Sequence, residues 1–262
     1  MEQRGAAAVD TPMIIDLTAW VGSWPTLIVR GEVVQVRDSL RHCGVNRICV
    51  SPLNAAWSLN PHLHNAAVYA LGERYDDILP TPVIDPTLPT WREAMERAER
   101  TPQTRMVRII PGYGGYSMEH IDSFCEAVSE AGLILAIQVR MDDPRRQHSL
   151  AQVPDVPAIE VAALARRHPS LRVVLAGAST GAIRTLANDL LSLPHFFADV
   201  SQADGLDAVR TLVDLGLLPK LLFGSHAPLF IPHSAIVRIL NDLDDAEVSV
   251  LLGKNAERLL GL

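Results

Sequence analysis

From Met13 onward the chain repeats one pattern: a short apolar or β-branched run, a break of polar residues, glycine or proline, and then a helical segment. Runs that are apolar on both faces are typical of parallel strands covered by helices, and parallel strands need a crossover between them. Eight repeats without a change in composition favour one closed (β/α)8 TIM barrel of the α/β class over an open doubly wound sheet. The strand-like runs are residues 13–20, 47–52, 78–85, 106–113, 133–140, 172–178, 196–202 and 221–228.

Apolar spacing and stop signals predict helices between these runs. The segment 117–131, for example, ends before Gly132, a common C-terminal cap. The longest connection, 141–154, follows the fifth strand, where a barrel of this kind carries its active-site loops. The predicted helices are 61–77, 88–100, 117–131, 156–168, 180–193, 206–217 and 234–260, the last with a break near Asp244–Asp245.

Charge and composition exclude several classes of protein. The net charge is −7, and no block of lysine and arginine indicates binding to nucleic acid or to an anionic membrane. No apolar run approaches the roughly 18 to 20 residues that span a bilayer. Residues 1–12 lack the apolar core of a signal peptide, so we expect a flexible tail there and one domain over 13–262. We therefore expect a soluble, cytoplasmic protein, with a homo-oligomer left open; reduced cysteines are expected at Cys43, Cys49 and Cys125.

Polar side chains gather at the predicted carboxyl ends of the strands. The stretch 221–230 (LLFGSHAPLF) presents His226 at the end of the eighth strand, where barrel chemistry is placed. Strand alternation puts Asp16 and Trp20 on one face of the first strand, and Gln138 and Arg140 on one face of the fifth. A buried guanidinium needs a partner. For Arg140 that partner is either a carboxylate of a ligand or a neighbouring aspartate, namely Asp142, Asp143 or Asp16.

Four stretches of this sequence resemble the amidohydrolase-related branch of the amidohydrolase superfamily. They are IID at 14–16, VRIIPGYGGYS at 107–117, FGSHAP at 223–228 and LLGKNAERLLGL at 251–262. Together with the eight-unit layout, the resemblance covers nearly the whole chain after Met13. It implies an amidohydrolase-like barrel with its site at the carboxyl ends of the strands.

The resemblance also implies side chains that bind a divalent metal. This chain has a different residue at each of those positions. The H-x-H pair of the first strand falls on Thr18 and Trp20, and the histidines of the fifth and sixth strands fall on Gln138 and Gly177. The aspartate of the eighth strand is His226. Since a zinc site needs at least three good protein donors, no metal and no other cofactor is predicted. The alternative is a single divalent metal such as zinc in a rearranged site drawing on His226, His148 and Asp16.

The first hypothesis for function is a metal-independent hydrolase that acts on a small carboxylate-bearing ester, lactone or amide. His226 would act as general base, Arg140 would bind an anion or stabilise an oxyanion, and Asp16 would orient His226 or pair with Arg140. Two alternatives stay open: a non-catalytic ligand-binding relative, and a metal-dependent hydrolase or decarboxylase. Further substrate-binding candidates are Arg108, Tyr113, Tyr116, Gln138, His148 and Trp20.

Two other motifs suggest a nucleophile and a metal site, respectively. Residues 177–181 form a literal G-x-S-x-G, which in an α/β-hydrolase would make Ser179 a nucleophile. No segment that could form an oxyanion hole precedes this motif, so we expect Ser179 to be a helix N-cap. His62 and His64 are two residues apart on a predicted helix and do not share a face, so chelation is not expected.

Overall fold

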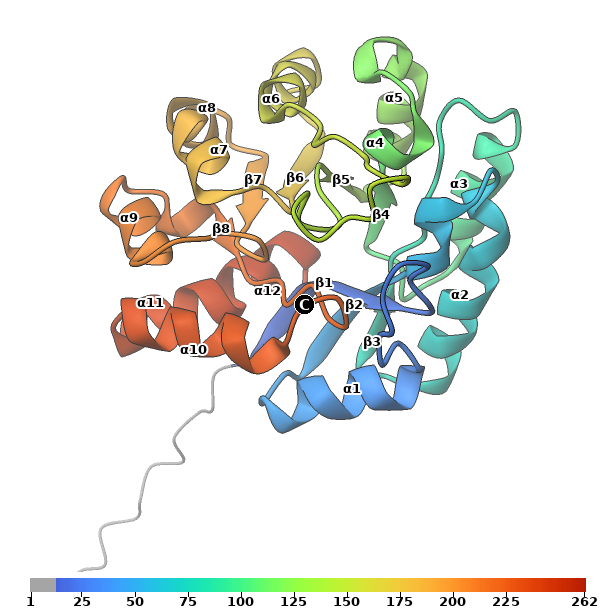
Figure 1. Ribbon diagram of the computed structural model, residues 1–262. Coiled ribbons are helices and arrows are strands. Elements are labelled where there is room, and N and C mark those ends of the chain that lie inside the picture. Colours follow the sequence, from blue (N-terminus) through green and yellow to red (C-terminus); the bar gives the residue numbers. More distant parts are fainter. Residues whose placement is uncertain (1–12) are drawn as a thin grey trace, which may run out of the picture.

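The computed structural model describes residues 13–262 and confirms the predicted barrel. Eight parallel strands follow one another around the centre, and the helices form an outer ring (Figure 1). Each observed strand lies within or overlaps one of the eight predicted runs. The predicted tail, residues 1–12, lies outside the described residues. The strands are β1 (Ile15–Val21), β2 (Arg47–Pro52), β3 (Ile78–Pro80), β4 (Met106–Ile109), β5 (Ile134–Gln138), β6 (Arg172–Ala176), β7 (Phe196–Asp199) and β8 (Leu221–Leu222).

The barrel is closed by backbone hydrogen bonds at two seams. Ladders run through β1-β2-β3 and through β4-β5-β6-β7-β8. A parallel bridge between Val83 and Arg108 joins the end of β3 to β4. At the other seam the Leu17 N–H donates to the carbonyl of Phe223 at 3.0 Å, and the His226 N–H donates to the carbonyl of Thr18 at 2.7 Å. His226 is thereby fixed to β1, close to the barrel axis.

Helices form where apolar residues recur on one face. In α3, Trp91, Met95 and Ala98 are buried at a spacing of four and three residues, and the opposite face carries charge. Asp244 caps α11 in a capping box with Glu247, which explains the predicted break in the last segment. The helices are α1 (Val33–His42), α2 (Asn65–Arg74), α3 (Trp91–Arg100), α4 (Pro111–Gly114), α5 (Asp122–Glu130), α6 (Ala158–Arg167), α7 (Thr180–Thr185), α8 (Ala187–Ser192), α9 (Ala208–Asp214), α10 (Pro232–Asp242), α11 (Asp245–Ser249) and α12 (Asn255–Leu260), with short 3-10 turns η1 (Leu53–Trp57), η2 (Pro61–His64), η3 (Met118–His120) and η4 (Leu218–Lys220) and a π-turn η5 (Val250–Lys254).

Helix α1 was not predicted from the sequence. Its ten residues bury only Val36 and Leu40, and six of the others are polar or charged, so the apolar stripe is too short to stand out. The apolar core has a layer between strands and helices and a second cluster inside the barrel. Ala256, Leu259 and Leu260 of α12 belong to that second cluster and pack against it. No helix within residues 13–262 is long and apolar enough to cross a membrane.

Candidate active site at the mouth of the barrel

A buried guanidinium occupies the centre of the barrel mouth. Arg108 projects from β4 and is fully buried. Its Nε donates to Ser51 Oγ at 3.1 Å, one terminal nitrogen donates to the Leu17 carbonyl at 2.9 Å, and the other donates to Gln138 Oε1. Burial lowers the pKa of Arg108 to about 10. The nearby negative charges of Asp199 and Asp16 act in the opposite direction and raise it. The side chain therefore stays protonated at neutral pH and places a fixed positive charge inside the mouth.

His226 lies beside this cation and is also fully buried. Its Nε2 lies 2.7 Å from the Met141 carbonyl, which can only accept, so Nε2 carries the proton. Its Nδ1 then accepts from the Trp20 indole N–H at 3.4 Å. Burial lowers the pKa of His226 to about 4, so the ring is neutral at pH 7. The lone pair of His226 faces Trp20, which does not fit the general-base role expected for this histidine.

Asp16 contacts neither of the partners expected for it. Its Oδ1 accepts from the backbone N–H groups of Thr18 and Ser225, both at 2.9 Å, and its Oδ2 accepts from the Ser225 hydroxyl at 2.5 Å. Burial raises the pKa of Asp16 to about 6 in spite of these hydrogen bonds, which lower it. The carboxylate thus fastens the turn after β8 to β1, and it does not orient His226 or pair with Arg140.

Asp199, at the end of β7, is a buried carboxylate that no sequence motif pointed to. It accepts from Thr18 Oγ1 at 2.5 Å, from Ser201 Oγ at 2.7 Å and from the Gly177 N–H at 3.0 Å. These bonds join β1, β6 and β7 below the mouth. Asp199 and Asp16 together supply the negative charge that compensates Arg108.

A cavity of about 560 Å³ opens at the carboxyl ends of β5, β7 and β8. Its wall carries four arginines and two aspartates, and its other side is formed by the apolar Leu229, Phe230 and Ile231. We call it the arginine pocket. The charged side chains in its wall are Arg140, Arg145, Arg146, Arg238, Asp143 and Asp204, and two further aspartates that do not line it, Asp155 and Asp142, lie within 4 Å of Arg140 and Arg146.

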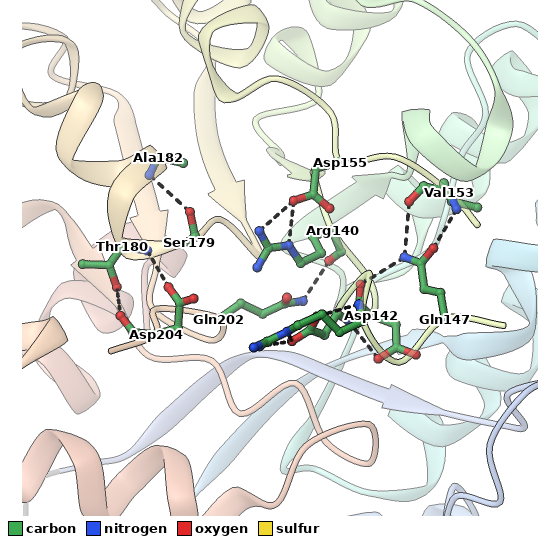
Figure 2. Close-up of polar contacts among 12 residues, drawn as sticks. Arg140, Asp142, Gln147, Val153, Asp155, Ser179, Thr180, Ala182, Gln202 and Asp204 are labelled. Carbon is green, nitrogen blue, oxygen red and sulfur yellow. Dashed lines mark hydrogen bonds and ion pairs between the residues drawn. The ribbon is translucent and has the colours of Figure 1, made fainter. Parts of the chain in front are cut away.

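Arg140 reaches this pocket but is paired with a residue that the sequence did not suggest. Its Nε and one terminal nitrogen donate to Asp155 Oδ2 at 2.8 and 2.7 Å, so neither Asp142 nor Asp143 nor Asp16 is its partner (Figure 2). Asp155 lies near the end of the long β5–α6 loop, so the alternation of side chains along β5 could not reveal this pairing.

Gln147 holds that β5–α6 loop together. Its amide accepts from the Val153 N–H at 2.7 Å and donates to the carbonyls of Asp142 and Val153 (Figure 2). His148 is exposed, accepts from the N–H of Leu150, and lines none of the cavities at the mouth. The structure therefore places His148 away from the ligand position expected for it.

Arg238, from α10, is the arginine in the pocket wall without a carboxylate partner among the described residues. Its terminal nitrogens donate to the backbone carbonyls of Ala203 and Val200, the latter at 2.9 Å. Its Nε is buried and has no hydrogen-bond partner within residues 13–262. Burial lowers the pKa of Arg238. Arg238 therefore borders the cavity with a positive charge that has no carboxylate within ion-pair distance among residues 13–262.

The remaining substrate-binding candidates lie around the arginine pocket without lining it. Gln138 accepts from Arg108 and donates to the Arg140 carbonyl at 2.7 Å, and Trp20 stacks on Arg108. Tyr113 packs edge-on against Trp57, with ring centroids 5.0 Å apart, and its buried hydroxyl has no partner in the part of the chain described. Tyr113 and Tyr116 border a separate hollow of only about 20 Å³. That volume holds about one water molecule and no substrate.

The two alternative motifs have structural roles. Ser179 Oγ accepts from the Ala182 N–H at 3.3 Å and caps α7, as expected, so it is not the nucleophile of an α/β-hydrolase (Figure 2). His62 contacts the Thr90 hydroxyl and accepts from the Asp85 N–H, both at 3.0 Å. No chelating pair forms there.

A family model described as amidohydrolase matches residues 56–262, well over half of the chain. This chain belongs to the amidohydrolase family. No curated protein matches it in sequence.

Several solved structures have the same fold at low sequence identity. An uncharacterised TIM-barrel protein from Bordetella bronchiseptica superposes with a TM-score of 0.72 at 15% identity, covering 95% of this chain and 98% of that one. The 2,6-dihydroxybenzoate decarboxylase gives 0.71 at 15% identity over 96% and 100%. The 5-carboxyvanillate decarboxylase from Novosphingobium aromaticivorans, solved with bound manganese, gives 0.67 at 13% identity over 89% and 82%. At these identities the likeness shows the fold.

The residues of this amidohydrolase do not fit a divalent metal at the place where the resemblance implies one. Thr18 donates to Asp199, Gln138 Oε1 accepts from the Arg108 cation, and His226 offers its lone pair to Trp20. At Gly177 a side chain has no room, because a Cβ would lie 2.4 Å from Gln138 Nε2 and 2.6 Å from the Arg140 carbonyl.

The rearranged metal site, considered as an alternative, is not assembled either. His148, His226 and Asp16 each bond to different protein groups. Residues 13–262 contain no group of three or more histidine, cysteine, aspartate or glutamate side chains placed to hold an ion. The donor chemistry at the mouth of this amidohydrolase therefore suits a guanidinium and not a metal.

Proposed function

We propose that this amidohydrolase is a metal-independent member of the family that binds a small carboxylate-bearing molecule in the arginine pocket. The observation that carries the proposal is the set of four arginines in the wall of this cavity, among which Arg238 has no carboxylate within ion-pair distance in the described chain. A carboxylate has the charge and the planar pair of oxygens that a guanidinium prefers. The clustering of four guanidinium groups in one wall supports the same class of ligand.

The independence from metal is supported by the buried cation. Arg108 already supplies a positive charge at the mouth, and its three hydrogen bonds consume acceptors that a metal would otherwise use. The names of two structural neighbours, decarboxylases of a dihydroxybenzoate and of a carboxyvanillate, refer to small aromatic acids, which is compatible with a carboxylate ligand here. The three cysteines are free thiols, which supports a cytoplasmic location as part of the proposal.

The test is calorimetric titration with benzoate as the probe, on the chain as purified. We expect binding that weakens at least tenfold in Arg238→Gln and by a smaller factor in Arg238→Lys, because the lysine keeps the charge but loses the planar pair of donors. Arg100→Gln is the matched control, since Arg100 is exposed and pairs only with Glu96 on the far side of α3. Equal affinity in wild type and Arg238→Gln overturns the proposal. Metal analysis on the same sample should find well under one equivalent of bound zinc or manganese, and a stoichiometric metal would overturn its metal-independent part.

A second candidate function is hydrolysis of a carboxylate-bearing ester, lactone or amide, and Ser225 favours it. The Ser225 hydroxyl donates to Asp16 at 2.5 Å, the pKa of Asp16 is raised by burial, and Ser225 borders the arginine pocket. Ser225 Oγ would add to the acyl carbon as its proton passes to Asp16, the leaving group would depart with a proton, and water would then release the acid.

Mass spectrometry after incubation with p-nitrophenyl acetate tests this candidate. It should show one acetyl group on wild-type protein and none on Ser225→Ala. Absence of both adduct and turnover, together with intact benzoate binding, identifies a non-catalytic ligand-binding relative.

A further inference from the structure

Gln202 lines the arginine pocket from the turn that follows β7, and only 6% of its surface is exposed. The turn is closed by the Ala203 N–H, which donates to the Val200 carbonyl at 3.1 Å. The same two residues hold Arg238, because its guanidinium donates to both of their carbonyls. Gln202 is thus part of the turn that Arg238 clamps, and both side chains line the same pocket.

The orientation of the Gln202 amide is fixed by its neighbours. Its Nε2 lies 2.9 Å from the Arg140 carbonyl, and a carbonyl only accepts, so the amide nitrogen faces Arg140 (Figure 2). The same nitrogen lies 3.3 Å from His226 Nε2, whose proton is directed to the Met141 carbonyl. Reversing the amide would bring two acceptor oxygens to 2.9 Å with no hydrogen between them. Oε1 is therefore the amide atom that remains for another partner.

The Oε1 atom of Gln202 is an acceptor without a donor. No group within residues 13–262 donates to it, and it is not among the fully buried polar atoms, so it meets the open space of the arginine pocket. The carboxylate of Asp143, in the same wall, differs because both of its oxygens accept from Arg145. A free acceptor on a side chain that is otherwise buried offers a hydrogen bond that a ligand in the pocket can complete.

Resting on the proposed carboxylate site, we propose that Gln202 is a specificity-determining residue of the arginine pocket. The substrate class is then a small carboxylate that also carries a hydrogen-bond donor, a hydroxyl or an amide N–H. The carboxylate binds the guanidinium of Arg238, and the donor binds Oε1 of Gln202 on the turn that Arg238 clamps. An acid of the same size without a donor makes the first contact and not the second.

Calorimetric titration with matched pairs of acids tests this inference. Butanoate is compared with 2-, 3- and 4-hydroxybutanoate, and acetoxyacetate is compared with N-acetylglycine, which has an amide N–H in place of the ester oxygen. One neutral hydrogen bond should make the donor-bearing acid bind about 3- to 10-fold more tightly than its partner. The pair that shows this gain identifies the donor as a hydroxyl or as an amide N–H.

Two variants assign the gain to Oε1. Gln202→Met keeps the length of the side chain and removes the acceptor, so the affinity ratio within each pair should fall to about one. The Arg140 carbonyl still accepts from Gln138 Nε2 at 2.7 Å in this variant, so no buried carbonyl loses its last donor. Unchanged binding of butanoate, to within about twofold, shows that the pocket is intact. Gln35→Met is the matched control, because Gln35 is exposed on α1 and does not line the arginine pocket. It should keep the wild-type ratio.

The outcomes separate this inference from the proposed function. Binding of butanoate with no gain for any donor-bearing acid overturns the role of Gln202 and leaves the carboxylate site standing. A gain that persists in Gln202→Met also overturns that role, because the donor then binds elsewhere in the pocket. Absence of binding by every carboxylate overturns both proposals.

Discussion

The guanidinium of Arg108 lies over the indole ring of Trp20, 4.9 Å from its centroid, inside the mouth of the barrel. Trp20 donates its indole N–H to His226, so one ring links the buried cation to the neutral histidine. A cation over an indole face is favourable, and it gains most where water is excluded. This stack stands where the resemblance implies an ion and its histidine ligands. The mouth therefore keeps a positive charge there, and the charge is built from the chain itself.

Replacing Arg108 by a neutral residue should strongly destabilise the folded protein. In Arg108→Gln the carboxylates Asp16 and Asp199 lose their buried counter-charge, and the change should lower the free energy of unfolding by about 3–5 kcal/mol. Urea unfolding followed by circular dichroism measures this. Arg100→Gln, which breaks an exposed pair, should change stability by less than about 0.5 kcal/mol. A similar small effect for both variants would show that Arg108 is not the charge centre of the mouth.

The protonation of His226 can be read directly by nitrogen-15 NMR of the imidazole rings. We expect a neutral ring protonated on Nε2 that remains neutral down to about pH 5, since burial holds its pKa at about 4. The folded-state pKa lies below the ordinary value, so this histidine stabilises the fold above about pH 6.5 and the contribution is lost as the pH falls toward 4. Trp20→Phe removes the donor to Nδ1 and should raise the pKa of His226. An unchanged pKa in that variant would contradict the hydrogen bond.

The titration of Asp16 should make the free energy of unfolding depend on pH in the opposite direction. Its pKa is raised from 3.8 to about 6, so the folded protein holds a proton that the unfolded chain has lost, and stability falls as the pH rises between these values. Asp16→Asn removes this dependence. Its stability relative to wild type should improve by up to ~3 kcal/mol between pH 4 and pH 7, as measured by urea unfolding. The control is Asp122→Asn, because the hydrogen bond from His168 lowers the pKa of Asp122, so its relative change should have the reverse sign and fall mainly below pH 4.

Two glycines with the same backbone conformation should respond differently to alanine. Both Gly177 and Gly132 have positive φ, +75° and +65°, so each alanine pays about 1–2 kcal/mol for the left-handed conformation. A Cβ at Gly177 also meets Gln138 and the Arg140 carbonyl, whereas at Gly132 it meets nothing within 4 Å. Gly177→Ala should therefore lose about 1–3 kcal/mol more than Gly132→Ala in thermal or urea unfolding. Equal losses would mean that the space around Gly177 is not tight.

The strands were predictable because each run is largely apolar or β-branched and is followed by polar residues, glycine or proline, as in the run that leads to His226. Helix α1 was not, since two buried residues among ten leave too weak a stripe. The position of His226 could be predicted for the same reason as the strands, but its hydrogen bonds could not. They depend on Met141 and Trp20, which are distant in sequence and meet only after the barrel closes.

Pairings across loops were the least predictable part of the site. Arg140 was expected to choose a near neighbour, but Asp155 reaches it after the β5–α6 loop turns back. Arg238 lies on α10, outside every strand end, and no periodicity marks it as part of a pocket. Asp199 had one usable signal, a lone acidic residue inside the apolar run 196–202, which a buried strand accepts only if it is fully hydrogen-bonded.

The lack of space around Gly177 also bears on how this sequence can change. A histidine there would need Gln138 and the backbone at Arg140 to move first, and Gln138 is held by the Arg108 guanidinium. A single substitution at Gly177 therefore cannot place a metal-binding side chain at the position that the family resemblance implies. New contacts at the mouth form more readily in the loops around the arginine pocket, where Arg145 and Arg146 are partly exposed, than beside Gly177.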